Sequence, residues 1–103
     1  MILIALTALL FGLGLYGVLT RRELVSILAS VEVMLGAASV LFIGLASRAP
    51  APLISAPGGT TEAIGVLLVV TFAAEAAVGL AIVVAAARAT GATRADELTE
   101  VKG

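Results

Sequence analysis

Two glutamates, Glu32 and Glu75, are the residues of this sequence whose type and position could do chemistry. Each interrupts an otherwise apolar run, at residues 24–47 and 63–87. An acid near the centre of a membrane-spanning helix costs about 2.5–3.5 kcal/mol, so its presence requires a compensating partner or a function. Hydrocarbon disfavours the charged carboxylate and a nearby cation favours it, and a group that can hold either state suits proton transfer. Both glutamates are therefore candidate proton-relay groups, and the alternative is a structural hydrogen-bond donor between helices.

The two glutamates are expected at similar depth. Glu32 lies ten residues after Arg22, and Glu75 lies thirteen residues before Arg88, which corresponds to about 15 and 20 Å at 1.5 Å per residue. Antiparallel packing of the two helices could therefore bring the acids to one polar seam. Helical spacing gives each acid neighbours on its own face, several of them small or hydroxylated. They are Ala29, Gly36 and Ser39 near Glu32, and Thr71, Val78 and Gly79 near Glu75.

The elements that must position these acids are three apolar segments. Residues 1–20 contain no charge, and a helix of that length covers the ~30 Å hydrocarbon core of a bilayer. No basic segment precedes it, so we expect a retained span and not a cleaved signal peptide. Residues 48–62 hold all three prolines, which end the second helix in a loop. We predict one all-α membrane domain over 1–103, with transmembrane helices at 1–20, 24–47 and 63–87 and a frayed or docked tail at 88–103.

Basic residues indicate how the three predicted helices are oriented in the membrane. All but one of them fall on the same side: Arg21, Arg22, Arg88, Arg94 and Lys102. Arg48 falls on the other side. The positive-inside rule then places the N-terminus outside and the C-terminus in the cytoplasm. Topology alone accounts for the adjacent Arg21 and Arg22, and a further role in coupling stays open.

Composition excludes several classes of protein. Apolar residues make up 61% of the 103-residue chain and charged residues 13%, against about 25% charged in a soluble domain. A net charge of −1 provides no basic surface for a nucleic acid. The absence of Cys and His removes the usual ligands of iron–sulfur clusters, structural zinc and haem, together with Ser-His or Cys-His nucleophile pairs. We therefore expect no catalytic residue, bound cofactor or metal in this chain.

One apparent motif is better explained by helix packing. Gly12, Gly14 and Gly17 match the G-x-G-x-x-G pattern of dinucleotide sites, but that pattern works at a strand-to-helix turn in water. Inside an apolar segment, small residues instead let a neighbouring helix approach closely. Tyr16, in the same segment, fits either an interfacial anchor or the core of a helix interface.

The sequence resembles subunit K of the proton-pumping NADH:quinone oxidoreductase, respiratory complex I. The resemblance covers nearly the whole chain and rests on several segments together. These are residues 10–22 with the arginine pair, residues 30–35 around Glu32, residues 73–83 around Glu75, and the tail with Asp96-Glu97-Leu98 and Lys102-Gly103. The sequence departs from the family at Gly36 and Ser39-Val40, where relatives usually carry asparagines. We expect water to fill the space that this leaves beside Glu32.

The resemblance implies a subunit of the membrane arm, in the bacterial plasma membrane, beside antiporter-like and other membrane-arm subunits. Glu32 and Glu75 would belong to the chain of ionisable residues along the middle of that arm, and Arg21 and Arg22 would match an arginine pair that influences coupling. FMN, iron–sulfur clusters and quinone would be carried by other subunits. The alternatives are the similar small C subunit of an Mrp-type sodium/proton antiporter and a purely structural membrane subunit.

Overall fold

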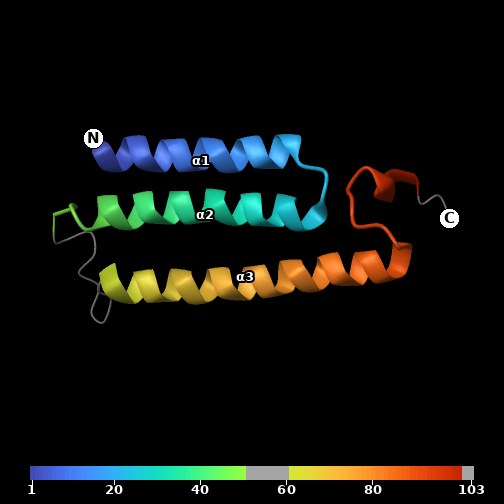
Figure 1. Cartoon of the computed structure of the whole chain (residues 1–103). Helices are drawn as coiled ribbons and strands as arrows, with labels where there is room; N and C mark the ends of the chain where they lie inside the picture. The colour runs from blue at the N-terminus through green and yellow to red at the C-terminus, as the bar shows by residue number, and fades with distance from the viewer. Residues whose placement is uncertain (51–60, 101–103) are drawn as a thin grey trace.

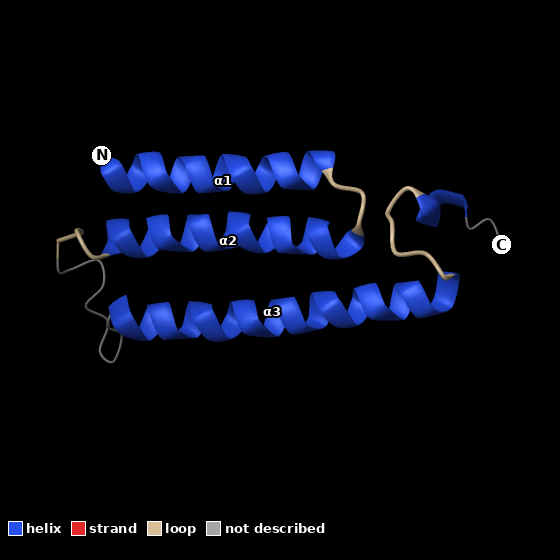
Figure 2. Ribbon diagram, viewed as in Figure 1, coloured by secondary structure: helices blue, strands red, loops and turns tan. Residues whose placement is uncertain are grey.

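In the computed structural model, which describes residues 1–50 and 61–100, the chain is almost entirely helical (Figures 1 and 2). Helices α1 (Ile2–Thr20), α2 (Leu24–Ala46) and α3 (Thr61–Thr90) are followed by a short 3-10 helix, η2 (Glu97–Glu100). Each long helix in the described part has the length and apolar composition to cross a membrane. The predicted all-α class with three spans is therefore confirmed. Most of the predicted Pro-rich loop, residues 51–60, and Lys102 lie outside the described residues.

Helix α3 is longer than the apolar run that predicts it. It begins two residues before residue 63 and ends three residues after residue 87. Glu62 in its first turn and Arg88 in its last turn complement the helix dipole, which favours both extensions. The helix ends at Thr90. The next residue, Gly91, has a positive φ of 71°, which suits glycine, and its amide donates to the carbonyl of Ala87 at 2.8 Å.

The helices form a single flat layer. Helix α2 lies between α1 and α3 and packs against both (Figure 1). The extents are 56 × 29 × 16 Å, and the smallest is little more than one helix diameter. Within the described residues, Ala37 and Ala92 are the buried apolar side chains, and most large apolar side chains are exposed. These faces must therefore be covered by lipid or by other subunits.

The α1–α2 interface depends on glycine. A Cβ atom added at Gly14 would lie 2.6 Å from Met34 Cγ, and one added at Gly17 would lie 2.9 Å from Ser30 Cβ. Side chains do not tolerate such distances, so glycine is what lets the two backbones approach. An atom added at Gly12 would meet nothing within 4 Å. The expectation that these small residues bring helices together is confirmed at Gly14 and Gly17, whereas Gly12 takes no part in the α1–α2 contact.

The α2–α3 interface sets the relative level of those two helices. A Cβ atom at Gly79 would lie 2.6 Å from Leu28 Cδ1, and one at Gly65 would lie 3.7 Å from Ile43 Cδ1. Residue numbers rise along α2 while they fall along α3, as expected for antiparallel neighbours (Figure 1). This register fixes which residues of the two helices share a depth.

The segment after α3 returns to the loop between α1 and α2. The amide of Leu24 donates to the carbonyl of Thr93 at 3.0 Å, and the amide of Ala95 donates to the carbonyl of Arg22 at 2.7 Å. Glu23 and Arg94 thus form an antiparallel β-bridge. The sequence leaves open whether the tail is frayed or docked. The described residues of the tail are docked. Their docking also places the α1–α2 loop and the end of α3 at one end of the molecule, opposite Arg48.

Candidate functional site

Glu32 and Glu75 lie at the same level of the α2–α3 pair. Glu32 follows Leu28 by one helical turn, and Glu75 precedes Gly79 by one turn. Because Leu28 meets the position of Gly79 and the helices are antiparallel, both acids are displaced from that contact in the same direction. The two helices therefore hold the acids at one depth, as the residue counts predict.

The two acids differ in their surroundings. Glu32 is half-buried, on the α2 face that also carries Leu28 and therefore faces α3. Glu75 is exposed, at the edge of the contact that Gly79 makes. Within residues 1–50 and 61–100, neither carboxyl group has a hydrogen bond or a salt bridge. The structure thus brings the acids level but leaves both without a polar partner in this part of the chain.

The polar groups near these acids are used by their own helices. Ser39 Oγ donates to the carbonyl of Leu35 at 2.8 Å, and Thr71 Oγ1 donates to the carbonyl of Leu67 at 2.8 Å. Gly36, one turn after Glu32, has nothing within 4 Å of a Cβ position, so open space adjoins the acid there. No group of three or more acidic side chains that could hold a metal ion is found among the described residues.

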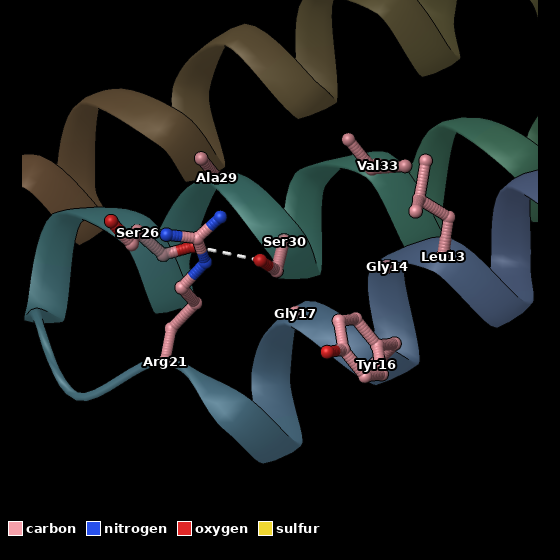
Figure 3. A pocket seen from close by; sticks show the side chains of 9 residues that line it. All are labelled: Leu13, Gly14, Tyr16, Gly17, Arg21, Ser26, Ala29, Ser30 and Val33. Carbon is pink, nitrogen blue, oxygen red and sulfur yellow. Dashed lines mark hydrogen bonds between the residues drawn. The ribbon is translucent and has the colours of Figure 1, made fainter.

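Arg21 borders a groove between α1 and α2. The groove has a volume of about 460 Å³ and is lined by Leu13, Gly14, Tyr16, Gly17, Arg21, Ser26, Ala29, Ser30 and Val33. In Figure 3 the Arg21 side chain lies over one end of the groove, beside Ser26 and Ser30. Ser30 Oγ donates to the carbonyl of Ser26 at 2.8 Å. Tyr16 lines the groove and is 65% exposed, so it is not part of the α1–α2 core.

Arg22 serves a different contact from its neighbour. Its Nη1 lies 3.7 Å from Asp96 Oδ2, and Arg94 donates two hydrogen bonds to the same carboxylate, at 3.2 and 3.1 Å. The hydrogen bond from Arg94 holds the pKa of the Asp96 carboxyl below its ordinary value, and Asp96 in turn raises the pKa of Arg94. We call Arg22, Arg94 and Asp96, with the β-bridge beside them, the tail clasp.

Sequence reasoning did not identify the groove or the tail clasp. Arg94 and Asp96 are two residues apart, so their pairing is local, but Arg22 is distant in sequence. The backbone hydrogen bonds of the clasp carry no residue-type signal. Ser26 and Ser30 are spaced by one helical turn near Arg21, which is the pattern that could have indicated the polar end of the groove.

The fold and the site define a class of protein: a small multi-pass membrane protein with two acids level at mid-span and, among the described residues, few buried side chains. Over residues 2–103 the sequence matches the family described as NADH-ubiquinone/plastoquinone oxidoreductase chain 4L. This protein therefore belongs to the chain 4L family. Most of the curated relatives described below are named subunit K.

Three curated relatives match this sequence over most of their length. NADH-quinone oxidoreductase subunit K of Anaeromyxobacter sp. (strain K) is 44% identical over 94 residues, which cover 90% of this chain and 87% of that protein. Subunit 11 of the same enzyme from Thermus thermophilus is 39% identical, covering 94% of each chain. Subunit K of Deinococcus radiodurans is 40% identical, covering 97% of this chain and 90% of that protein.

Proposed function

We propose that this chain is a membrane-arm subunit of an NADH:quinone oxidoreductase and contributes to proton translocation coupled to quinone reduction. Family membership supports the assignment to the complex. The observation that carries the proton role is the common level of Glu32 and Glu75 on adjacent spans. In this role each carboxyl group accepts a proton as an anion and releases it as a neutral acid, and water beside Gly36 extends the path from Glu32.

Partner subunits must complete this path. Glu75 is exposed and has no polar partner within the described residues, and an acid facing lipid costs about 2.5–3.5 kcal/mol. We infer that another membrane-arm subunit, of the antiporter-like kind or beside it, covers this face and supplies a polar group. Without such a neighbour the layer has too little interior to enclose a pathway.

In this proposal the chain takes part in proton transfer and carries out no redox step. It contains neither Cys nor His, and FMN, iron–sulfur clusters and quinone are assigned to other subunits. We place the complex in the bacterial plasma membrane, because the curated relatives named above are bacterial. We also propose that the clasp end lies in the cytoplasm and the N-terminus outside, because the positive-inside rule favours the side that carries most of the arginines.

The experiment compares Glu32→Gln and Glu75→Gln with Glu62→Gln in the assembled complex. Glu62 is an exposed acid in the first turn of α3, so its variant matches the loss of charge outside the proposed path. We expect both mid-span variants to assemble, to oxidise NADH normally with an artificial acceptor, and to lose at least about tenfold in proton pumping, as for removal of a general acid–base group. Coupled quinone reduction should fall with pumping.

Normal pumping by assembled Glu32→Gln and Glu75→Gln complexes would contradict the relay and favour a purely structural role for both acids. Loss of pumping by Glu62→Gln as well would show that charge at any depth matters, which would also contradict it.

A further inference from the structure

The groove beside Arg21 has the polarity gradient of a phospholipid. One end holds the Arg21 guanidinium and the hydroxyls of Ser26 and Ser30 (Figure 3). Leu13 and Val33, which are 59% and 41% exposed, line the other end, further into the membrane span. A headgroup and an acyl chain follow each other in the same order from the membrane surface inward.

The polar end of the groove has unused donors. Among the described residues, the side chain of Arg21 makes no salt bridge or hydrogen bond, whereas Arg22 beside it pairs with Asp96. Ser26, which also lines the groove, has no hydrogen bond at its Oγ in the described part of the chain. No acidic side chain lines the groove. Arg21 is therefore the charged residue of the groove lining, and its charge is positive.

Glycine gives the groove its floor. Gly14 and Gly17 line it at the closest approach of α1 to α2, where an added Cβ would collide with Met34 or Ser30. The groove is consequently an open hollow on one side of two tightly packed helices, about 460 Å³ in volume. A guanidinium fork matches the oxygens of a phosphate group, and basic pockets between spans are suited to anionic headgroups.

We propose that this groove binds the headgroup of an anionic phospholipid. Arg21 donates to the phosphate oxygens, Ser26 adds a hydroxyl donor, and an acyl chain lies along Leu13 and Val33. Tyr16 stands at the rim, at headgroup level. The two adjacent arginines then have different functions, because Arg21 binds the lipid headgroup while Arg22 pairs with Asp96 of the tail. It stands independently of the proton relay.

The test measures lipid retention by the purified full-length chain with native mass spectrometry. The probes are phosphatidylglycerol and phosphatidylcholine with the same acyl chains, and inorganic phosphate alone. The wild-type chain should retain phosphatidylglycerol over phosphatidylcholine, and Arg21→Gln should lower that preference about fivefold, the effect of one arginine near an anionic lipid. Arg88→Gln, which removes the same charge at the same end of the bundle outside this groove, should leave the preference unchanged.

Arg21→Lys keeps the charge and should keep most of the preference, and circular dichroism should show unchanged helix content in all three variants. Equal losses in Arg21→Gln and Arg88→Gln would overturn the proposal, because retention would then reflect overall charge. Binding of phosphate ions as strong as that of phosphatidylglycerol would overturn it in favour of a free-anion site. An unchanged preference in a folded Arg21→Gln chain would overturn it directly.

Discussion

The effect of replacing a glycine in α1 depends on the helix face that the glycine occupies. A Cβ atom added at Gly14 would lie 2.6 Å from Met34 Cγ and 2.8 Å from the backbone carbonyl oxygen of Ser30. A Cβ atom added at Gly12 would meet open space. Gly14→Ala must therefore push the helices apart, at a cost of about 1–3 kcal/mol for overpacking. Gly12→Ala should be neutral or stabilising by up to about 1 kcal/mol, because alanine favours a helix.

Thermal unfolding of the purified chain, followed by circular dichroism, measures this difference. Equal midpoints for the two variants would show that the close α1–α2 approach at Gly14 is wrong.

At the scale of single residues, the acids also explain why the chain needs neighbouring subunits. Glu32 faces α3 and is half-buried, but Glu75 is exposed, and a carboxyl group cannot remain in lipid without cost. A carboxyl group is costly in lipid because its anionic form is poorly solvated there. For the same reason, a polar partner from a neighbouring subunit can shift each acid toward its anionic or its neutral form, which proton transfer requires.

At the scale of elements, the tail clasp joins the end of α3 to the α1–α2 loop. Asp96→Asn removes the carboxylate that Arg22 and Arg94 share, so we expect the tail to open more often. Hydrogen exchange should speed up at the amides of Leu24 and Ala95, whose acceptors are carbonyls across the clasp. Glu62→Gln, at the other end of α3, is the control and should leave these amides protected. Unchanged protection in Asp96→Asn would mean that the backbone bonds suffice.

The clasp also predicts a pH dependence. Arg94 lowers the pKa of Asp96 from its ordinary 3.8, so this carboxylate stabilises docking above that ordinary value and loses its contribution as the pH falls through the lowered pKa. Exchange at Leu24 and Ala95, corrected for the intrinsic rate at each pH, should therefore rise in acid. This acid step should be absent in Asp96→Asn, and its persistence there would assign it to another group.

The spans and the depth of the acids could be predicted because both depend on local quantities. Apolar length identifies a span, and a fixed rise per residue converts ten or thirteen residues into a depth. The end of α3 was less predictable, since Arg88, Ala89 and Thr90 continue a helix that apolar content alone would end at residue 87. The clasp could not be predicted, because it joins backbone atoms of segments about seventy residues apart.

At the scale of the whole molecule, the single layer of helices requires neighbours. Gentle purification of the chain from its membrane should therefore bring other subunits with it. We expect those subunits to carry flavin and iron–sulfur clusters, visible in the absorption spectrum and by mass spectrometry. A colourless set of antiporter subunits would instead assign the chain to an Mrp-type sodium/proton antiporter.

We propose that Glu32 and Glu75 change protonation as quinone is reduced. Infrared difference spectroscopy of the assembled complex, before and after quinone reduction, tests it most directly because a protonated carboxyl group has its own C=O band. We expect carboxyl bands in the difference spectrum that are lost in Glu32→Gln and Glu75→Gln and kept in Glu62→Gln. Identical difference spectra for the wild-type complex and both mid-span variants would contradict it.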